Sequence, residues 1–299
     1  MRYDVSHVTE FDYSQPVSIS HHLLHLTPRA CTFQISHQSR LVIDPAPAVN
    51  QAGSDYFGNP TTFIVVQAPH EKLTIRARSL IDVAPVTPPE PAATMPWDQV
   101  AAAVRADSSK PMLDIAQFMF VSPFTKAGDE VEDYARESFA PGRPVLDAAR
   151  DLTKRIFNDF TYDGSATDVS TPVDEAMRLK RGVCQDFAHL QIACLRKLGL
   201  PARYVSGYLL THPPEGKEKL TGADASHAWL SVWCPGHGWV DLDPTNDLIP
   251  GDEHITLAWG RDYGDVSPVN GVMVGGGEHE VKVAVDVRPL QSSRQNGRG

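Results

Sequence analysis

The chain has 299 residues, 41% of them hydrophobic and 21% charged, so it is long enough for one large or two medium domains with a substantial core. The net charge of −10 argues against nucleic acid or an anionic membrane surface as the main partner. No apolar run predicts a membrane-spanning helix, and the first residues lack the apolar stretch of a secretory signal. We therefore expect a cytoplasmic protein whose four scattered cysteines are free thiols.

Residues 1–84 have the pattern of β-strands separated by turns. Alternating or β-branched runs lie at 2–13, 38–45, 61–67 and 73–83. They predict a small antiparallel β-sandwich as an N-terminal domain. The next segment, 85–97, holds five prolines and predicts a stiff linker at a domain boundary.

Residues 98–289 form the second predicted domain, which is helical first and then rich in strands. Apolar residues at helical spacing predict a helix over 143–157, and Thr171-Pro172 predicts the start of another that ends near Lys180. Strands are predicted at 203–210, 225–233, 239–243 and 278–289. The pattern leaves open whether the last strand joins the sheet of the second domain or the N-terminal domain. Residues 290–299 are predicted to be a disordered tail.

Cys184 follows the helix breaker Gly182 and stands where a new helix begins. The unpaired N–H groups and the dipole of a helix N-terminus favour negative charge, so they favour a reactive thiolate at this position. The apolar stripe of the same helix includes Phe187, Leu190 and Cys194. Cys184 precedes this stripe by one turn, and we expect its side chain to face the interior or a cleft. Cys194, in the helix body, is expected to be an inert core thiol.

A hairpin further along the chain supplies a histidine and an acid. The strands 225–233 and 239–243 flank the turn-rich residues 234–238. A turn centred on Pro235 places His227 directly opposite Asp243, at the distance over which a carboxylate can orient an imidazole ring. Asp241 lies on the same face but diagonally, so this register favours Asp243. A different loop length would change the register.

Four segments together resemble the bacterial transglutaminase-like cysteine protease family. They are Gly-Val-Cys-Gln-Asp-Phe-Ala-His (182–189), Gly-Leu-Pro-Ala-Arg-Tyr-Val-Ser-Gly-Tyr (199–208), Ser-His-Ala-Trp (226–229) and Gly-Trp-Val-Asp-Leu-Asp-Pro-Thr (238–245). The resemblance extends to 158–162 and 260–269, and Phe57-Gly58-Asn59 resembles the β domain often fused in front of this core. It implies an α+β fold, in which a papain-like core packs a cysteine-bearing helix on an antiparallel sheet.

The same resemblance implies the roles of three residues: Cys184 as nucleophile, His227 as general base and acid, and Asp243 as the residue that orients His227. It implies a thioester intermediate formed from a substrate carboxamide. One feature departs from the family, because no tryptophan lies between Trp97 and Trp229 to serve as the upstream oxyanion donor of the animal enzymes. Gln185 and Tyr162 are candidates for that donor, and Trp229 is a candidate support for His227.

No metal or cofactor is expected. The histidines at 21, 22 and 25 lack an acid or cysteine at ligand spacing, Cys234-x-x-His237 is half of a zinc motif, and no acidic calcium loop is present. We therefore predict a cysteine-dependent hydrolase of a peptide or protein amide. Amine transfer, as in a true transglutaminase, and a catalytically silent peptide-binding module are the alternatives. The sequence specifies neither the physiological substrate nor the oligomeric state.

Overall fold

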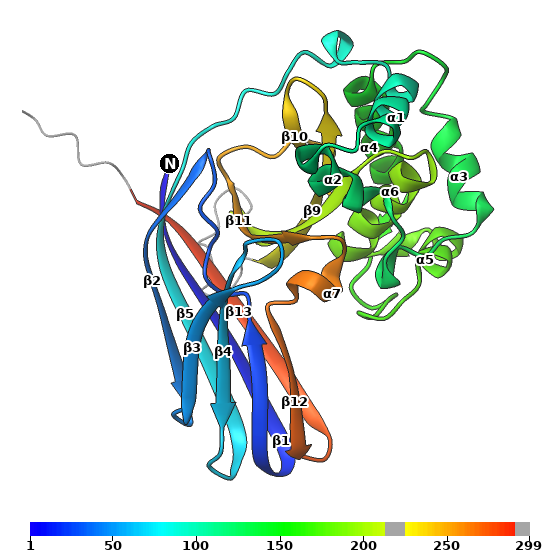
Figure 1. Cartoon of the computed structure of the whole chain (residues 1–299). Coiled ribbons are helices and arrows are strands. Elements are labelled where there is room, and N and C mark those ends of the chain that lie inside the picture. Colours follow the sequence, from blue (N-terminus) through cyan, green and yellow to red (C-terminus); the bar gives the residue numbers. More distant parts are fainter. Residues whose placement is uncertain (213–224, 291–299) are drawn as a thin grey trace, which may run out of the picture.

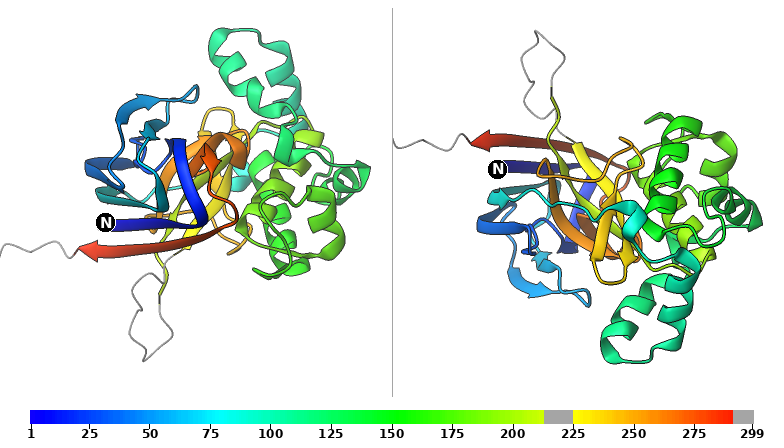
Figure 2. Two further views of the ribbon diagram at one scale, coloured as in Figure 1. Left: turned by 90° about the horizontal axis from the view of Figure 1, so that it is seen from below. Right: turned by 90° about the horizontal axis from the view of Figure 1, so that it is seen from above.

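The computed structural model describes residues 1–212 and 225–290. A four-stranded antiparallel sheet lies between a group of helices and a larger sheet with long strands (Figures 1 and 2). Among the described residues, no helix is long and apolar enough to cross a membrane. Of the predicted disordered tail, Leu290 ends a strand, and the remaining residues lie outside the described part of the chain.

The larger sheet is built around one long strand, β1 (Arg2–Leu24). Its first part pairs with β5 (His70–Val83) and its second part with β4 (Pro60–Val66), both antiparallel. The outer strands are β2 (Gln34–Asp44) and β3 (Val49–Ser54). Side chains from both parts of the sheet fill one core, formed by Tyr13, Val17, Leu24, Leu26, Ile43, Ile64, Val66, Leu73, Ile75 and Ala77. The predicted sandwich is therefore a single continuous sheet whose two parts cover a common core.

Two strands from the end of the chain complete this sheet. The strands β12 (Val269–Gly275) and β13 (His279–Leu290) both pair antiparallel with β1, on the edge that β4 and β5 leave open. The range 98–289 predicted for the second domain thus includes two strands that belong to the N-terminal sheet. Alternation in the sequence predicts that a strand forms, but its partner depends on which edge is free in the folded protein.

The helices, which lie on the side of the smaller sheet away from the larger sheet, come mostly from the middle of the chain. The α-helices are α1 (Trp97–Ala106), α2 (Lys110–Ala116), α3 (Asp129–Arg136), α4 (Val145–Asp159), α5 (Val173–Leu179), α6 (Cys184–Lys197) and α7 (Tyr263–Val266). The 3₁₀ turns η1 (Pro91–Ala93), η2 (Gln117–Met119) and η3 (Pro123–Thr125), and the short parallel strands β6 (Thr161–Tyr162) and β7 (Arg181–Gly182), complete this region. The predicted helices at 143–157 and 172–180 are therefore confirmed as α4 and α5.

The helix α6 is the centre of the helical region and packs on the smaller sheet. It packs against β9 (Ala225–Cys234) and β8 (Ala202–Leu209) of the smaller sheet, whose order is β10-β9-β8-β11, with β10 (Gly238–Leu242) and β11 (His254–Gly260) at the edges. The helices α3, α4 and α5 lie against its other sides, so almost every α6 residue after the first turn is buried. This arrangement confirms the predicted helix-on-sheet core.

The β9–β10 hairpin differs from its predicted register by two residues. Asp241 pairs with Ser231 and not with Trp229, because the turn is centred on Gly236 instead of Pro235. Gly236 and Gly238 have φ angles of 81° and 86°, in the left-handed region that glycine occupies without steric cost, so they permit this tighter turn. Since side chains alternate with a period of two, a shift of two residues keeps every side chain on its predicted face.

Two buried amide side chains join the sheets. Asn59 accepts a hydrogen bond from Trp259 N (3.0 Å) and donates one to Trp259 O (2.8 Å), and Gln34 does the same with Thr256 N (2.9 Å) and Thr256 O (2.7 Å). Both amides are completely buried. They satisfy polar groups on the open edge of β11 that another strand would otherwise have to pair. The N-terminal sheet is therefore fixed against the smaller sheet.

Candidate active site

Cys184 is the first residue of α6, as predicted. Asp186 fixes this helix start, because its Oδ2 accepts hydrogen bonds from Val183 N (2.8 Å) and Thr167 Oγ1 (2.7 Å). The N–H of Cys184 has no acceptor within the helix, since the first four N–H groups of a helix lack one. Its side chain is half-buried and lines a cleft. Cys194 differs from Cys184 as predicted, because burial raises the pKa of its thiol to about 12.

His227 lies on β9 and is buried, with its ring between two acidic partners. Its Nε2 lies 2.7 Å from Asp243 Oδ2, and a hydrogen bond to the Cys184 side chain also contributes to its titration. Burial favours the neutral ring, but the hydrogen bonds and charges of Asp243 and Cys184 outweigh it and raise the pKa of His227 to about 10. The surroundings of His227 therefore favour the protonated form of its ring.

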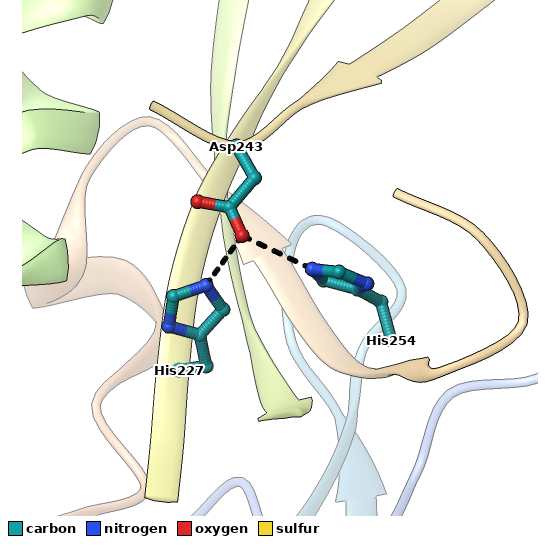
Figure 3. Close-up of side chains that lie close together, drawn as sticks. All are labelled: His227, Asp243 and His254. Carbon is teal, nitrogen blue, oxygen red and sulfur yellow. Dashed lines mark hydrogen bonds and ion pairs between the residues drawn. The ribbon is translucent and has the colours of Figure 1, made fainter. Parts of the chain in front are cut away.

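Asp243 is completely buried just after β10 ends (Figure 3). Its Oδ2 accepts hydrogen bonds from His227 Nε2, from Asn246 Nδ2 (2.7 Å) and from His254 Nε2 (3.1 Å), while its Oδ1 accepts one from Thr245 N (2.9 Å). Burial alone would raise the pKa of Asp243, but these donors, His227 first, hold it below its ordinary value. The carboxylate is therefore kept ionised beside His227.

Asp241, the rejected alternative, has other partners. Its carboxylate accepts hydrogen bonds from Trp229 Nε1 (3.0 Å) and Ser231 Oγ (2.5 Å). Trp229 is completely buried, with its ring centroid 6.0 Å from that of His227 and 5.2 Å from that of His254. Its N–H is occupied by Asp241, so Trp229 can support His227 by packing but is not placed as an oxyanion donor. A Cβ at Gly207, opposite His227 in the register, would collide with this indole ring.

The two candidates for the oxyanion donor, Gln185 and Tyr162, differ in their hydrogen bonding and exposure. The side-chain amide of Gln185 donates to Val169 O (3.0 Å), so one of its N–H groups is already engaged. Tyr162 is opposite Gly182 in the β6–β7 pair, and its ring is 60% exposed. Burial and the nearby charge of Cys184 raise the pKa of Tyr162. The hydroxyl of Tyr162 therefore lies within electrostatic range of the thiol and is a protonated donor near neutral pH.

The cleft beside Cys184 has a volume of about 690 Å³, and both sheets contribute to its walls. Cys184, Gln185 and His227 lie on the catalytic side. The opposite side comes from the N-terminal sheet, with His7, Thr9 and Phe11 of β1 and Val281, Val283 and Val285 of β13. The terminal strands thus give the cleft an apolar wall next to the thiol.

Two polar contacts of Asp243 were not predicted from the sequence. Asn246 lies in the turn Asp-Pro-Thr-Asn after β10, where an asparagine is typical of turn chemistry, so local sequence gave a weak signal for it. His254 begins β11 and has no local signal, because only the pairing of β11 with β8 brings it to the site. The ring nitrogens of His227 and His254 and a carboxylate oxygen of Asp243 lie within 4.8 Å of one another, a spacing that could hold a metal ion. The contacts of both rings with Asp243 have hydrogen-bond lengths.

Comparison with protein families gives two matches along the chain. Residues 3–82 match the bacterial transglutaminase-like N-terminal region, and residues 132–244 match the transglutaminase-like superfamily. The second match includes Cys184, His227 and Asp243.

Curated proteins similar over almost the whole chain come from mycobacteria. The uncharacterized protein Rv2569c of Mycobacterium tuberculosis is 43% identical over 97% of this chain and 93% of its own length. The uncharacterized protein ML0607 of Mycobacterium leprae is 32% identical over 97% of this chain and 99% of its own. A protein-glutamine gamma-glutamyltransferase of Pseudomonas aeruginosa is 33% identical over only 92 residues, which are 30% of this chain and 14% of that protein.

One solved structure shares the arrangement of both sheets. The "Putative Cysteine Protease from Cytophaga hutchinsonii" superposes with a TM-score of 0.77 and covers 98% of this chain and 92% of its own. The two sequences are 21% identical, so the similarity concerns the fold. It includes the N-terminal sheet as well as the helices and the catalytic sheet, which supports the assignment of the predicted fold class.

Proposed function

The chain belongs to the transglutaminase-like superfamily, with the bacterial N-terminal region ahead of the core, and on that premise we propose that it is a cysteine-dependent amide hydrolase. The observation that carries this proposal is the order of contacts Cys184–His227–Asp243. A half-buried thiol at a helix N-terminus lines the same cleft as an imidazole whose Nε2 lies 2.7 Å from a buried carboxylate, and the charge of the thiol raises the pKa of that imidazole. Those are the nucleophile, base and orienting acid of acyl transfer.

The proposed reaction has two steps. The Cys184 thiolate attacks the carbonyl carbon of the amide, and a C–S bond forms as the oxygen takes up negative charge. His227 then donates its proton to the nitrogen as the C–N bond breaks, which releases an amine and leaves a thioester. In the second step His227 removes a proton from water, the hydroxide attacks the thioester, and a carboxylic acid leaves as the thiolate is restored.

The developing oxyanion needs two donors. We assign the first to the backbone N–H of Cys184, which has no acceptor within its helix. The second is the hydroxyl of Tyr162, because the Gln185 amide is occupied by Val169 O while the charge of Cys184 reaches Tyr162. No metal or cofactor takes part in this proposal.

We propose a peptide or protein amide as the substrate. The cleft of about 690 Å³ is large enough for a short peptide segment, and its valine wall favours an apolar neighbour of the reacting amide. Hydrolysis is preferred over amine transfer because the sequence lacks the upstream tryptophan donor of the animal cross-linking enzymes. All four cysteines are free, which supports a reducing, cytoplasmic location.

Alkylation of the thiols tests the nucleophile. At slightly acidic pH, iodoacetamide should label Cys184 much faster than the buried Cys234, whose pKa burial raises to about 12. The fast phase should be lost in Cys184→Ala and retained in Cys31→Ser. Equal labelling of Cys184 and Cys234 would contradict an activated nucleophile.

Product analysis tests the reaction. A panel of peptide amides and glutamine-containing peptides is incubated with the protein, with and without a primary amine, and the products are weighed by mass spectrometry. Conversion of amide to carboxylic acid supports hydrolysis. Dominant incorporation of the amine would replace hydrolysis by transglutamination. Partner capture without turnover, unchanged in Cys184→Ala, would favour the silent binding module.

A further inference from the structure

The carboxylate of Asp243 is shared by two imidazole rings. Its Oδ2 lies 2.7 Å from His227 Nε2 and 3.1 Å from His254 Nε2, and both rings point at the same oxygen (Figure 3). An ionised carboxylate can only accept hydrogen bonds, so each Nε2 must carry the hydrogen of its contact. The two rings come from different strands, His227 from β9 and His254 from β11.

The surroundings of His254 fix its tautomer. The residue is 4% exposed, and its Nδ1 is buried without a hydrogen-bond partner among the described residues. A hydrogen on that Nδ1 would be buried without an acceptor, which costs about 1–3 kcal/mol. The ring is also fixed edge-on against Trp229, with 5.2 Å between the centroids. His254 therefore carries a hydrogen on Nε2 and presents that N–H to Asp243.

The Nε2–H of His254 is separated from the Cys184 thiol by Asp243 and His227. On one side of Asp243 stands His254, on the other His227, and beyond His227 stands Cys184. The remaining donors to the carboxylate are neutral, namely Asn246 Nδ2 and Thr245 N from the turn after β10. The nearest acid on β10, Asp241, is occupied by Trp229 and Ser231.

We propose that His254 is a positioning residue of the reaction, whose Nε2–H orients the Asp243 carboxylate so that it stabilises the imidazolium form of His227. The proposal rests on the proposed role of Cys184. Outer hydrogen bonds of this kind tune the inner residue by orientation and charge, as they do for ligands of metal sites. Without the His254 donor, Oδ2 of Asp243 keeps only its contacts with His227 and Asn246, so the carboxylate is less firmly oriented and holds the imidazolium less strongly. We then expect Cys184 to react quickly only at higher pH.

A matched pair of variants tests this role in the full-length chain. His254→Gln keeps an N–H donor at a similar reach, while His254→Leu fills the space without one. The rate of Cys184 alkylation by iodoacetamide is measured from pH 5 to pH 9, with the site identified by mass spectrometry. In His254→Leu we expect the acid limb of the pH–rate profile to move up by about one pH unit, so that the alkylation rate at a given acidic pH falls roughly tenfold. In His254→Gln we expect the alkylation rate to stay within about threefold of that of the unaltered protein.

Two outcomes would overturn the proposal: a His254→Leu profile that coincides with that of the unaltered protein, or equal displacement in both variants. If neither variant folds, the ring nitrogens of the unaltered protein decide the matter by NMR. A bare Nδ1 and a protonated Nε2 on His254 support the proposal, and the reverse tautomer contradicts it. Because alkylation needs no amide, a protein with the expected profiles that hydrolyses no amide would refute the hydrolase proposal and leave the role of His254 in place.

Discussion

Two buried polar clusters in this protein differ in whether a hydrogen-bonding group remains available for another residue or a ligand. Around Arg196, near the end of α6, the guanidinium donates to Phe118 O, Ser122 Oγ, Thr125 Oγ1, Ala202 O and Arg261 O. All of these acceptors are neutral, and burial lowers the pKa of Arg196 to about 10. Around Asp243 the carboxylate is equally well bonded, but one partner, His227, has a second nitrogen available to the thiol of Cys184.

The contrast shows that burial and a shifted pKa do not by themselves mark a site of reaction. The Arg196 cluster joins η2, η3, β8 and the residues after β11, and its five hydrogen bonds leave no donor for a ligand. The Asp243 cluster ends at a thiol that lines a cleft. We therefore expect changes near Asp243 to alter chemistry and changes at Arg196 to alter stability.

The largest expected effect is at Asp243. Asp243→Asn should lower the rate of amide turnover by about 10²- to 10⁴-fold, because it removes the charge that stabilises the His227 imidazolium and permits the wrong tautomer. Steady-state kinetics on the best amide of the panel measures it. Asp241→Asn is the matched control and should stay within about threefold. Similar losses in both variants would mean that the two aspartates do not have separate roles.

Arg196→Met should chiefly reduce stability. The change leaves five buried acceptors without their charged donor, and we expect the free energy of unfolding to fall by about 3–5 kcal/mol. Urea denaturation measures this, while the alkylation rate of Cys184 in the folded variant should remain within about threefold of normal. A folded Arg196→Met protein whose Cys184 no longer reacts quickly would contradict the purely stabilising role of the Arg196 cluster.

Asn59→Ala tests the contact between the two sheets, for which we expect a smaller loss of stability than at Arg196. The variant loses both hydrogen bonds to Trp259 and leaves that buried backbone unpaired, at a cost of about 2 kcal/mol. Because β1 and β13 form a wall of the cleft, KM for amides should rise more than kcat falls. Asn59→Asp, which keeps the size of the side chain but not its donor, serves for comparison. Unchanged unfolding and unchanged KM would show that this contact does not fix the N-terminal sheet.

The last expected effect concerns pH and a histidine outside both clusters, and it is negligible near neutral pH. Burial, followed by the charge of Arg196, lowers the pKa of His189 to about 3, and its Nε2 accepts a hydrogen bond from Tyr263 N (3.1 Å). Below pH 6.5 the unfolded chain takes up a proton that the folded protein refuses, so stability falls as the pH drops toward 3, by about 1.4 kcal/mol per unit. His189→Gln keeps an acceptor and should flatten the dependence of unfolding free energy on pH by that amount between pH 6 and 4. An unaltered slope would show that His189 titrates normally.

Local patterns predicted the elements of the site but not all of their pairings. Cys184 at a helix start follows from Gly182 and the apolar spacing behind it, and α6 begins at that residue. The face shared by His227 and Asp243 follows from the period of two along a strand. The register of the hairpin could not be predicted from that period, because it depends on the left-handed turn at Gly236 and Gly238. As a result, Asp243 lies beyond the end of β10 and contacts His227 diagonally.

The sequence by itself determined the family and the start of α6 at Cys184, and it predicted the proposed nucleophile, since these depend on short segments whose chemistry is local. Only the tertiary structure decided that β12 and β13 return to the N-terminal sheet, that their valines border the cleft, and that His254 donates to Asp243. Those contacts join residues far apart in the chain, and they arise from which strand edges remain open once the cores are packed. No periodicity within one segment carries that information.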